Sequence, residues 1–329
     1  MMHQMAAPAR IAACQIEDLR SIPASRMREL LDEETRNWRS RLHWDFSGSA
    51  ELVTRYINMR ALDGLALVCG SELAGYCYWV LEEHKALLGD LYVRDLWRTP
   101  QAESQLLNQA IETLRHSASL PALSVRRVES QLMQLGNPEA LVWQAGNSPE
   151  RFPRIFMLAP LERLSRCRAL TFGEAARIFR WGPIWFDATA ALIADVYHGH
   201  VDSLINDQYN SPTGAERFLR NIVNFPGCGS FQHEASFVAL APSGSVLGCV
   251  IATRVAPDTG HIAQLCASRD WLGRGLGYEL LRRSMLALQS GGCREVSLTV
   301  TESNRQAQRL YARMGFHSIH RFHALVWNR

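Results

Sequence analysis

The segment Gly273–Gly277, with the sequence GRGLG, opens a helical pattern and decides how the rest of the chain is interpreted. A glycine turn at a helix N-terminus exposes backbone N–H groups, which can hold a pyrophosphate at the positive end of the helix dipole. A second segment, Asn304–Phe316 (NRQAQRLYARMGF), follows after one strand pattern. It places Asn304, Ala307 and Tyr311 on one helical face, since positions i, i+3 and i+7 share a face. A glycine cluster alone is weak evidence, but the ordered pair is specific.

In this order and spacing, the two segments resemble the two cofactor-binding motifs of the GNAT acetyltransferase superfamily, which uses acetyl-CoA. The resemblance implies an α/β (α+β) fold, in which a mixed, mostly antiparallel twisted sheet is flanked by helices. The chain departs from the family at Leu272, where the usual pattern begins with Gln or Arg. Arg274 supplies a formal charge close by.

The bulk properties are those of a soluble globular protein. The 329 residues predict about two domains, with 47% apolar and 20% charged residues. A net charge of +3 gives no reason to expect nucleic acid binding, and no apolar stretch is long enough to span a membrane. Met1–Cys14 has no signal-peptide pattern. The eight cysteines contain no C-x-x-C pair, so we expect reduced, mostly buried thiols and a cytoplasmic protein, monomeric or homodimeric.

The chain repeats one pattern of elements in its two halves. Hydrophobic periodicity and turn residues in the second half predict, in order, the strands 235–240, 245–255 and 261–267, a helix 275–289, a strand 295–300, a helix 304–314 and a terminal strand ending at Trp327. The same order in the first half predicts strands 65–69, 74–81 and 87–93, a helix 102–114, a strand 124–132, a short helix from Asn137 and a strand 155–159. This duplication predicts tandem domains of one fold, residues 1–165 and 166–329.

The first half lacks the cofactor signals of the second. Gln101 and Glu103 stand where the second half has Gly275 and Gly277, and side chains there would crowd a pyrophosphate, which the Glu103 carboxylate would also repel. Gln144 stands opposite Tyr311. We therefore expect a degenerate first domain without cofactor and a catalytic second domain, the alternative being two equal active sites.

The resemblance assigns the cofactor contacts to two backbone segments and one amide. In the family, the pantetheine arm pairs with the strand before the glycine turn, and N–H groups of that strand can polarise the thioester carbonyl. Asn304 matches the residue that binds the pantetheine amides, although Asn is also a favoured helix N-cap. The expected cofactor-binding residues are Leu265, Cys266, Ala267, Gly273, Arg274, Gly275, Leu276, Gly277, Tyr278 and Asn304.

Two residues are candidates for acid–base catalysis. Tyr311 matches the family's general acid, and a phenol can protonate the departing thiolate; the alternative is a core tyrosine. His261 aligns with the glutamate base of histone acetyltransferases in this superfamily, and an ordinary imidazole titrates near neutral pH. A solvated histidine at a strand edge is the alternative. Another base position of the family is Thr299 here, which cannot serve.

A dense polar segment follows the apolar helical run 188–196 and predicts a cleft for the acceptor. Its candidate residues are His198, His200, Asp202 and Tyr209. A helix end followed by a polar loop would explain the same pattern. No metal is expected, because histidines at i and i+2 of a helix splay apart.

These features predict an acetyl-CoA-dependent N-acyltransferase that acts on a primary amine of a small molecule by direct attack in a ternary complex. Mycothiol synthase-like enzymes have a similar tandem layout with one degenerate half. One alternative is a protein or peptide N-acetyltransferase. Another is a CoA-binding sensor or scaffold without turnover, which Leu272 and Thr299 favour and Tyr311 opposes.

Overall fold

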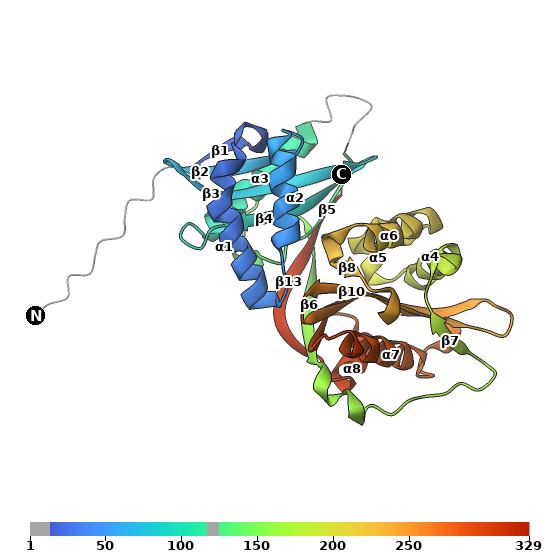
Figure 1. The fold of residues 1–329 in the computed structure, drawn as a ribbon. Helices are drawn as coiled ribbons and strands as arrows, with labels where there is room; N and C mark the ends of the chain where they lie inside the picture. Colours follow the sequence, from blue (N-terminus) through green and yellow to red (C-terminus); the bar gives the residue numbers. More distant parts are fainter. Residues whose placement is uncertain (1–13, 117–124, 329) are drawn as a thin grey trace, which may run out of the picture. The chain divides into compact units, whose positions relative to one another are not determined.

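The computed structural model describes residues 14–116 and 125–328. Contacts between Cα atoms divide the chain into two compact units (Figure 1). The first comprises the residues up to Glu34, the segment Ala50–Pro149 and the last residues from Val326. The second comprises Thr35–Ser49 and Glu150–Leu325. A short N-terminal segment thus belongs to the second unit, and the functional division at residue 165 remains a prediction.

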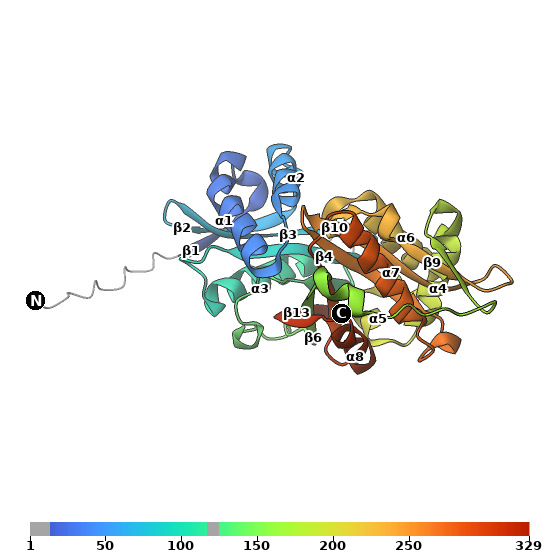
Figure 2. The same ribbon diagram turned by 60° about the horizontal axis from the view of Figure 1, so that its bottom comes forward.

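The first part of the chain forms an antiparallel sheet with one parallel pair at its end. Its elements are β1 (Cys14–Asp18), α1 (Ala24–Leu42), α2 (Ser47–Asn58), β2 (Gly64–Cys69), β3 (Glu72–Glu82), β4 (Lys85–Val93), α3 (Pro100–His116) and β5 (Arg127–Gln131). The strands follow the order β1-β2-β3-β4-β5, and only β4 and β5 run parallel. The helices α1 and α2 lie side by side over this sheet (Figures 1 and 2), where Leu30 and Val53 pack with Tyr76 and Tyr92.

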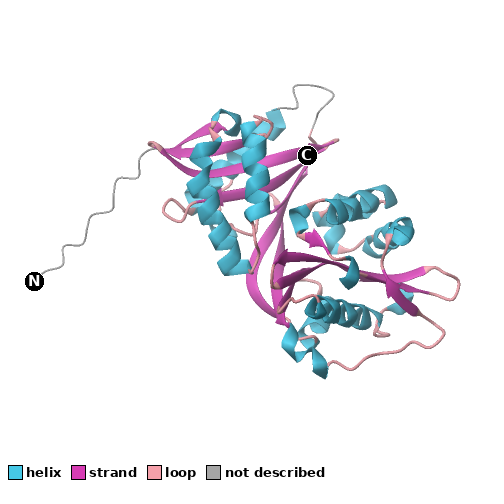
Figure 3. Cartoon of the chain, in the orientation of Figure 1, coloured by secondary structure: helices cyan, strands magenta, loops and turns pink. Residues whose placement is uncertain are grey.

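The second unit has helices on both faces of its sheet (Figure 3). Its elements are β6 (Glu150–Pro160), β7 (Arg177–Arg180), α4 (Phe186–Tyr197), α5 (Val201–Ile205), α6 (Pro212–Asn224), β8 (Ser230–Phe231), β9 (Phe237–Leu240), β10 (Val246–Ala256), β11 (Thr259–Ala267), α7 (Leu276–Ser290), β12 (Glu295–Thr301), α8 (Arg305–Arg313) and β13 (His317–Asn328). The strand order is β13-β6-β12-β11-β10-β9-β7. Apolar residues of α7 and α8 cover one face, and those of α4 and α6 cover the other.

The two halves share the same irregularity of strand pairing. In the hairpin β10–β11 the register shifts by one residue between Ile251 and Ala252, and in β3–β4 it shifts between Tyr78 and Trp79. β11 then pairs in parallel with β12 only over Thr259–Ile262. From Ala263 to Ala267, β11 remains paired with β10 alone, so its other edge has no strand partner within the described chain. This unpaired edge lies directly before the glycine turn.

The mixed fold and the order of elements agree with the expectations from the sequence, and three details differ. The strand predicted at 155–159 as the end of the first half is β6, and it pairs with β12 of the second unit. The helix predicted from Asn137 is a single 3-10 turn, Pro138–Ala140. Cys14 and Cys69 form a disulfide, not free thiols, because they are direct partners across β1 and β2. Within residues 14–116 and 125–328, no helix combines the length and hydropathy of a membrane span.

Candidate functional site

The glycine turn forms an uncapped helix N-terminus. Gly273 and Gly275 have φ angles of 75° and 86°, in the left-handed region that glycine tolerates. α7 begins at Leu276, and no side chain caps its first N–H groups. A Cβ atom at Gly275 would lie 2.7 Å from Leu170 Cδ1. Arg274 and Leu272 are exposed beside the turn, whose backbone donors suit an anionic group.

Asn304 lies at the start of α8 and makes two contacts. Its Oδ1 accepts a hydrogen bond from the Ala307 N–H at 3.1 Å, which is the N-cap role. Its Nδ2 lies 3.3 Å from Nε2 of His200. The amide therefore caps its helix and also links α8 to the polar segment that follows α4.

Tyr311 is a buried phenol on α8. Its ring packs on Phe316, with the centroids 5.8 Å apart. Burial raises its pKa above the ordinary phenol value, and the charge of Asp202 raises it further. Such a phenol carries its proton at neutral pH and can donate it. Tyr197 and Tyr209 stack at 4.4 Å, and the pKa of Tyr197 is raised mainly by burial, with further contributions that include the charges of Asp202 and Tyr311.

Asp202 follows Val201, which lines a cavity of about 280 Å³. Its Oδ1 accepts a hydrogen bond from the Thr301 hydroxyl, and its backbone N–H donates to His200 Nδ1 at 3.1 Å. Val201 and Thr301 line this cavity together with Arg305. The structure thus brings His200, Asp202 and Tyr209 together with Asn304 and Tyr311, as the contacts above describe.

His198 differs from the other three residues of the predicted acceptor cleft. It ends α4 and is exposed. Its backbone carbonyl accepts a hydrogen bond from Arg269 at 2.8 Å. Among the described residues, no group of three or more His, Cys, Asp or Glu side chains has the arrangement of a metal site.

His261 is enclosed by apolar rings. It is 8% exposed, and its imidazole packs against Trp44 and Phe156 at centroid distances of 5.1 and 6.1 Å. Ser297 Oγ donates to the Gly260 carbonyl, so the 2.9 Å contact between Ser297 Oγ and His261 Nδ1 is donated by the imidazole. Nε2 is then the basic nitrogen. Burial lowers the pKa of His261 to about 4, so the near-neutral titration expected from the sequence is wrong.

The three expected pantetheine-binding residues lie on the edge of β11 that has no strand partner. Cys266 points its side chain to the α4 face, where it is 6% exposed and packs with Ala190 and Ile193. Its sulfur lies 3.5 Å from that of Cys249, its direct partner on β10. The thiol is therefore part of the core, while the backbone groups of Leu265, Cys266 and Ala267 follow the unpaired edge.

Two polar residues of this region give no clear signal in the sequence. Gln264 is 3% exposed on β11, and its Oε1 accepts a hydrogen bond from the Tyr209 hydroxyl at 3.4 Å. Arg154 lies on β6, directly opposite Thr301 of β12. A polar residue within an apolar strand could have indicated Gln264. Arg154 could not be found, because its strand was assigned to the other half.

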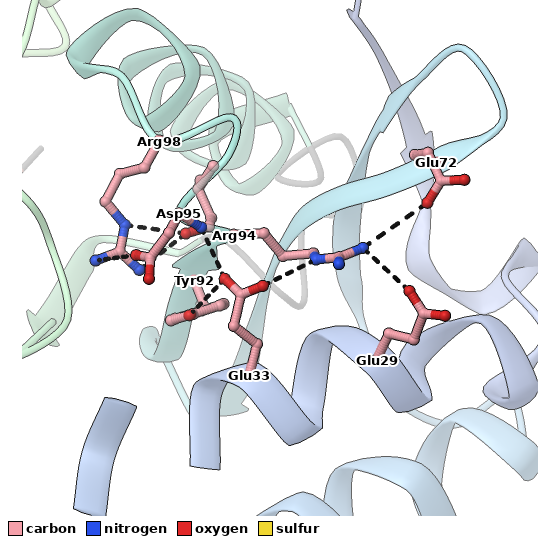
Figure 4. Close-up of polar contacts among 8 residues, drawn as sticks. Glu29, Glu33, Glu72, Tyr92, Arg94, Asp95 and Arg98 are labelled. Atoms are coloured by element: carbon pink, nitrogen blue, oxygen red, sulfur yellow. Dashed lines mark hydrogen bonds and ion pairs between the residues drawn. The ribbon is translucent and has the colours of Figure 1, made fainter. Parts of the chain in front are cut away.

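At the corresponding turn of the first unit, two side chains make hydrogen bonds within the chain. Thr99 Oγ1 accepts a hydrogen bond from the Ala102 N–H, and the Glu103 carboxylate accepts one from the Gly136 N–H at 2.8 Å. Beyond the end of β4, Figure 4 shows the Glu33 carboxylate between Tyr92 and Arg94. It accepts from the Tyr92 hydroxyl at 3.1 Å, from Arg94 Nε at 3.2 Å and from the Asp95 N–H at 2.7 Å.

Comparisons with known proteins point to one family. Residues 200–316 match the acetyltransferase (GNAT) family. The chain is 42% identical over 57 residues to the N-alpha-acetyltransferase MAK3 of Arabidopsis thaliana, which is 17% of this chain and 30% of that protein. It is 36% identical over 62 residues to the mycothiol acetyltransferase of Corynebacterium jeikeium (strain K411), or 19% and 18% of the two chains. The chain therefore matches less than a third of either relative.

Solved structures extend the likeness of fold over nearly the whole chain. A GCN5-related N-acetyltransferase from Sphaerobacter thermophilus superimposes with a TM-score of 0.68 at 18% identity, covering 96% of this chain and 95% of that one. A tandem GNAT protein from the clavulanic acid biosynthesis pathway superimposes with a TM-score of 0.59 at 14% identity, covering 96% and 98%.

Proposed function

Because residues 200–316 form a domain of the GNAT acetyltransferase family, we propose that this chain transfers the acetyl group of acetyl-CoA to a primary amine of a small molecule. The observation that carries the proposal is the succession of an unpaired strand edge and an uncapped glycine turn in β11 and α7. The first offers backbone groups to a pantetheine arm, and the second offers N–H donors to a pyrophosphate. Tyr311 supplies a buried proton donor.

Each part of acetyl-CoA has a proposed partner. The N–H groups from Gly273 to Tyr278 bind the pyrophosphate, and Arg274 adds a charge. The backbone of Leu265–Ala267 pairs with the pantetheine arm, and one of its N–H groups polarises the thioester carbonyl. Since Asn304 Oδ1 caps α8, its Nδ2 is the atom available for a pantetheine carbonyl.

The reaction needs one proton acceptor and one proton donor. The acceptor enters as an ammonium ion, loses a proton, and its nitrogen lone pair attacks the carbonyl carbon of the thioester. The carbon–sulfur bond breaks, and Tyr311 protonates the departing thiolate. The phenolate regains a proton from the amine nitrogen through solvent. The products are the N-acetyl amine, free CoA and one proton.

Two groups are candidates to accept the proton of the amine: His261 directly, or a water relay. His261, the base proposed from the sequence, is neutral at pH 7, but burial makes its Nε2 a weak base. The contacts of His200 with Asn304 and with Asp202 favour a water relay held by His200 and Asp202. A weak base in an apolar enclosure is the less effective of the two, since general bases work best with a pKa near the working pH.

The second unit alone is proposed to bind cofactor, so that each chain carries one active site. Two contacts of the first unit support this proposal: Thr99 Oγ1 accepts the Ala102 N–H at the start of α3, and the Glu103 carboxylate, which would repel a pyrophosphate, is held by the Gly136 N–H. The residues before 165 then serve as a supporting domain.

Acetylation of a peptide N-terminus is the second candidate function. One observation favours it, namely the 42% identity over 57 residues to a protein named as an N-alpha-acetyltransferase. A sensor that binds CoA without turnover is opposed by the buried Tyr311, which has no role in binding alone.

A thiol-release assay tests the proposal. The protein is mixed with acetyl-CoA and either a library of small primary amines or short peptides with free N-termini, and free CoA is followed with time. We expect turnover with members of the amine library and none with the Gly275→Glu variant. Turnover with peptides alone would move the function to the second candidate. Cofactor binding without turnover in either arm would support the sensor.

A further inference from the structure

Arg154 on β6 carries a guanidinium group without a partner in the described chain. Its Nε is buried and makes no hydrogen bond, and no carboxylate lies within ion-pair distance of the group among the described residues. The residue as a whole is partly exposed, but its Nε is a buried donor, and buried donors in folded proteins are nearly always satisfied. A buried donor without an acceptor costs free energy, and an anionic group that is absent from the isolated chain would remove this cost.

Gln264 provides a second buried donor without an acceptor. The residue is 3% exposed, and its Nε2 makes no hydrogen bond in the described chain, while its Oε1 is oriented by the Tyr209 hydroxyl. The amide is therefore fixed with its NH₂ group unsatisfied. Gln264 therefore adds a second unsatisfied donor to that of Arg154.

Both donors belong to the surroundings of Tyr209 and Tyr311. Burial raises the pKa of each tyrosine most, Asp202 raises it further, and the positive charge of Arg154 opposes both effects. Arg154 also lies opposite Thr301, whose hydroxyl donates to Asp202. The charges of Arg154 and Asp202 thus act on the proposed proton donor in opposite directions, and the two side chains form no ion pair with each other.

We propose that Arg154 and Gln264 bind a carboxylate of the acceptor, so that the substrate is an amine that also carries a carboxylate, of the amino-acid class. Asp202 then lies on the side of the ammonium group. This inference rests on the proposed acetyl transfer. A planar carboxylate matches the planar donor fork of a single arginine. A phosphate ester carries up to two charges, for which one arginine and a neutral amide are a poor match, and Asp202 would repel it.

The test compares pairs of amines that differ only in this group. The kcat/KM of each amino acid in a series of increasing length is measured beside that of its carboxamide, for the unaltered protein and for Arg154→Gln. The carboxylate preference is the kcat/KM of the amino acid divided by that of its carboxamide. Because both proteins are measured with the same pair, differences in amine basicity cancel when their preferences are compared. We expect the unaltered protein to prefer the carboxylate, and Arg154→Gln to lose about ten- to a hundredfold of that preference with an unchanged KM for acetyl-CoA.

Three further variants keep the test decisive. Arg154→Lys retains the charge without the fork and should keep part of the preference. Gln264→Leu should reduce it even if Arg154→Gln fails to fold. Arg177→Gln removes an exposed charge on β7 and should leave it unchanged. Equal rates for both members of every pair, or a preference that survives in both Arg154→Gln and Gln264→Leu, would overturn the inference while leaving acetyl transfer intact.

A binding measurement covers the case in which no amine is acetylated, which would contradict the proposed function. Calorimetry of the CoA-loaded protein with the same amino acids and carboxamides should then still show carboxylate-dependent binding that Arg154→Gln abolishes. Absence of such binding would overturn the inference as well.

Discussion

The strand–turn–helix units β4–α3 and β11–α7 are two versions of one structure with opposite chemistry at the turn. Both strands have nine residues, both have a register shift against the preceding strand, and both pair in parallel with four residues of the next. In the first, Thr99 Oγ1 accepts from the Ala102 N–H at the start of α3, and Glu103 accepts from the Gly136 N–H, whereas no side chain caps α7 at Gly275. The same scaffold thus carries two different turns, and we propose that the open turn at Gly275 is the one that binds the cofactor.

The largest effect on acetyl-CoA binding is expected when a carboxylate, such as the first unit carries at Glu103, is placed in the glycine turn of the second unit. Gly275→Glu introduces a carboxylate, a residue unsuited to a φ of 86° and a contact with Leu170, so acetyl-CoA affinity should fall at least about a hundredfold. Gly244→Glu is the matched control, because Gly244 also has a positive φ of 87° but has open space around it. Calorimetry measures both. Equal affinity in the two variants would contradict the assignment of the turn.

Replacing one tyrosine of each unit by phenylalanine distinguishes a catalytic hydroxyl from a structural one. Tyr311→Phe should lower kcat at least about tenfold with little change in acetyl-CoA affinity, since general-acid help is typically worth about 10²–10⁴ in rate. Tyr92→Phe removes the hydrogen bond to Glu33 and should lower stability, not kcat. Steady-state kinetics under conditions where chemistry is rate-limiting decides. An unchanged kcat in Tyr311→Phe would mean that water protonates the thiolate.

His261 should make the second unit less stable in acid. Its pKa is about 4 in the folded chain and about 6.5 when unfolded, so its contribution is complete above pH 6.5 and is lost as the pH falls towards 4. The loss amounts to about 3 kcal/mol by linkage. Denaturant titrations at pH 7 and pH 4.5 should show a smaller fall in stability for His261→Gln than for the unaltered protein. Parallel falls would place the imidazole in contact with water.

Asp90 should make the stability of the first unit depend on pH in the opposite direction to His261, and by a smaller amount. Burial raises its pKa to about 6, while Glu34 and the Leu91 N–H lower it, so folding favours the protonated form. Its contribution is complete below the unfolded value near 4 and is lost as the pH rises through 6. Asp90→Asn should remove this loss, seen as a smaller fall in stability between pH 4.5 and pH 7.5. The same fall in both proteins would show that Asp90 is ionised throughout.

The sequence predicts the parts of this comparison that depend on local patterns. The strands, the helix starts at α3 and α7, and the contrast of Gly275 with Gln101 follow from periodicity and turn chemistry. Partners that depend on distant segments could not be predicted. Trp44 packs against His261 because Thr35–Ser49 belongs to the second unit, and Arg154 lies opposite Thr301 because β6 pairs with β12.

The disulfide between Cys14 and Cys69 is likewise set by strand register, since 55 residues separate the two in the chain. The burial of His261 likewise shows that the pKa of a side chain cannot be predicted from the sequence when distant segments enclose it. A histidine at that position suggests a near-neutral base, and only the surrounding rings and Ser297 show how weak its basicity is.

The number of acetyl-CoA molecules bound per chain tests the central claim most directly. Isothermal titration of the unaltered protein should give one site, and the Gly275→Glu variant should give none. The double variant Gln101→Gly/Glu103→Gly should still bind only one, because Thr99 Oγ1 continues to accept the Ala102 N–H at the start of α3. Two equivalent sites in the unaltered chain, or one site that survives Gly275→Glu, would show that the first unit binds the cofactor and would contradict the account.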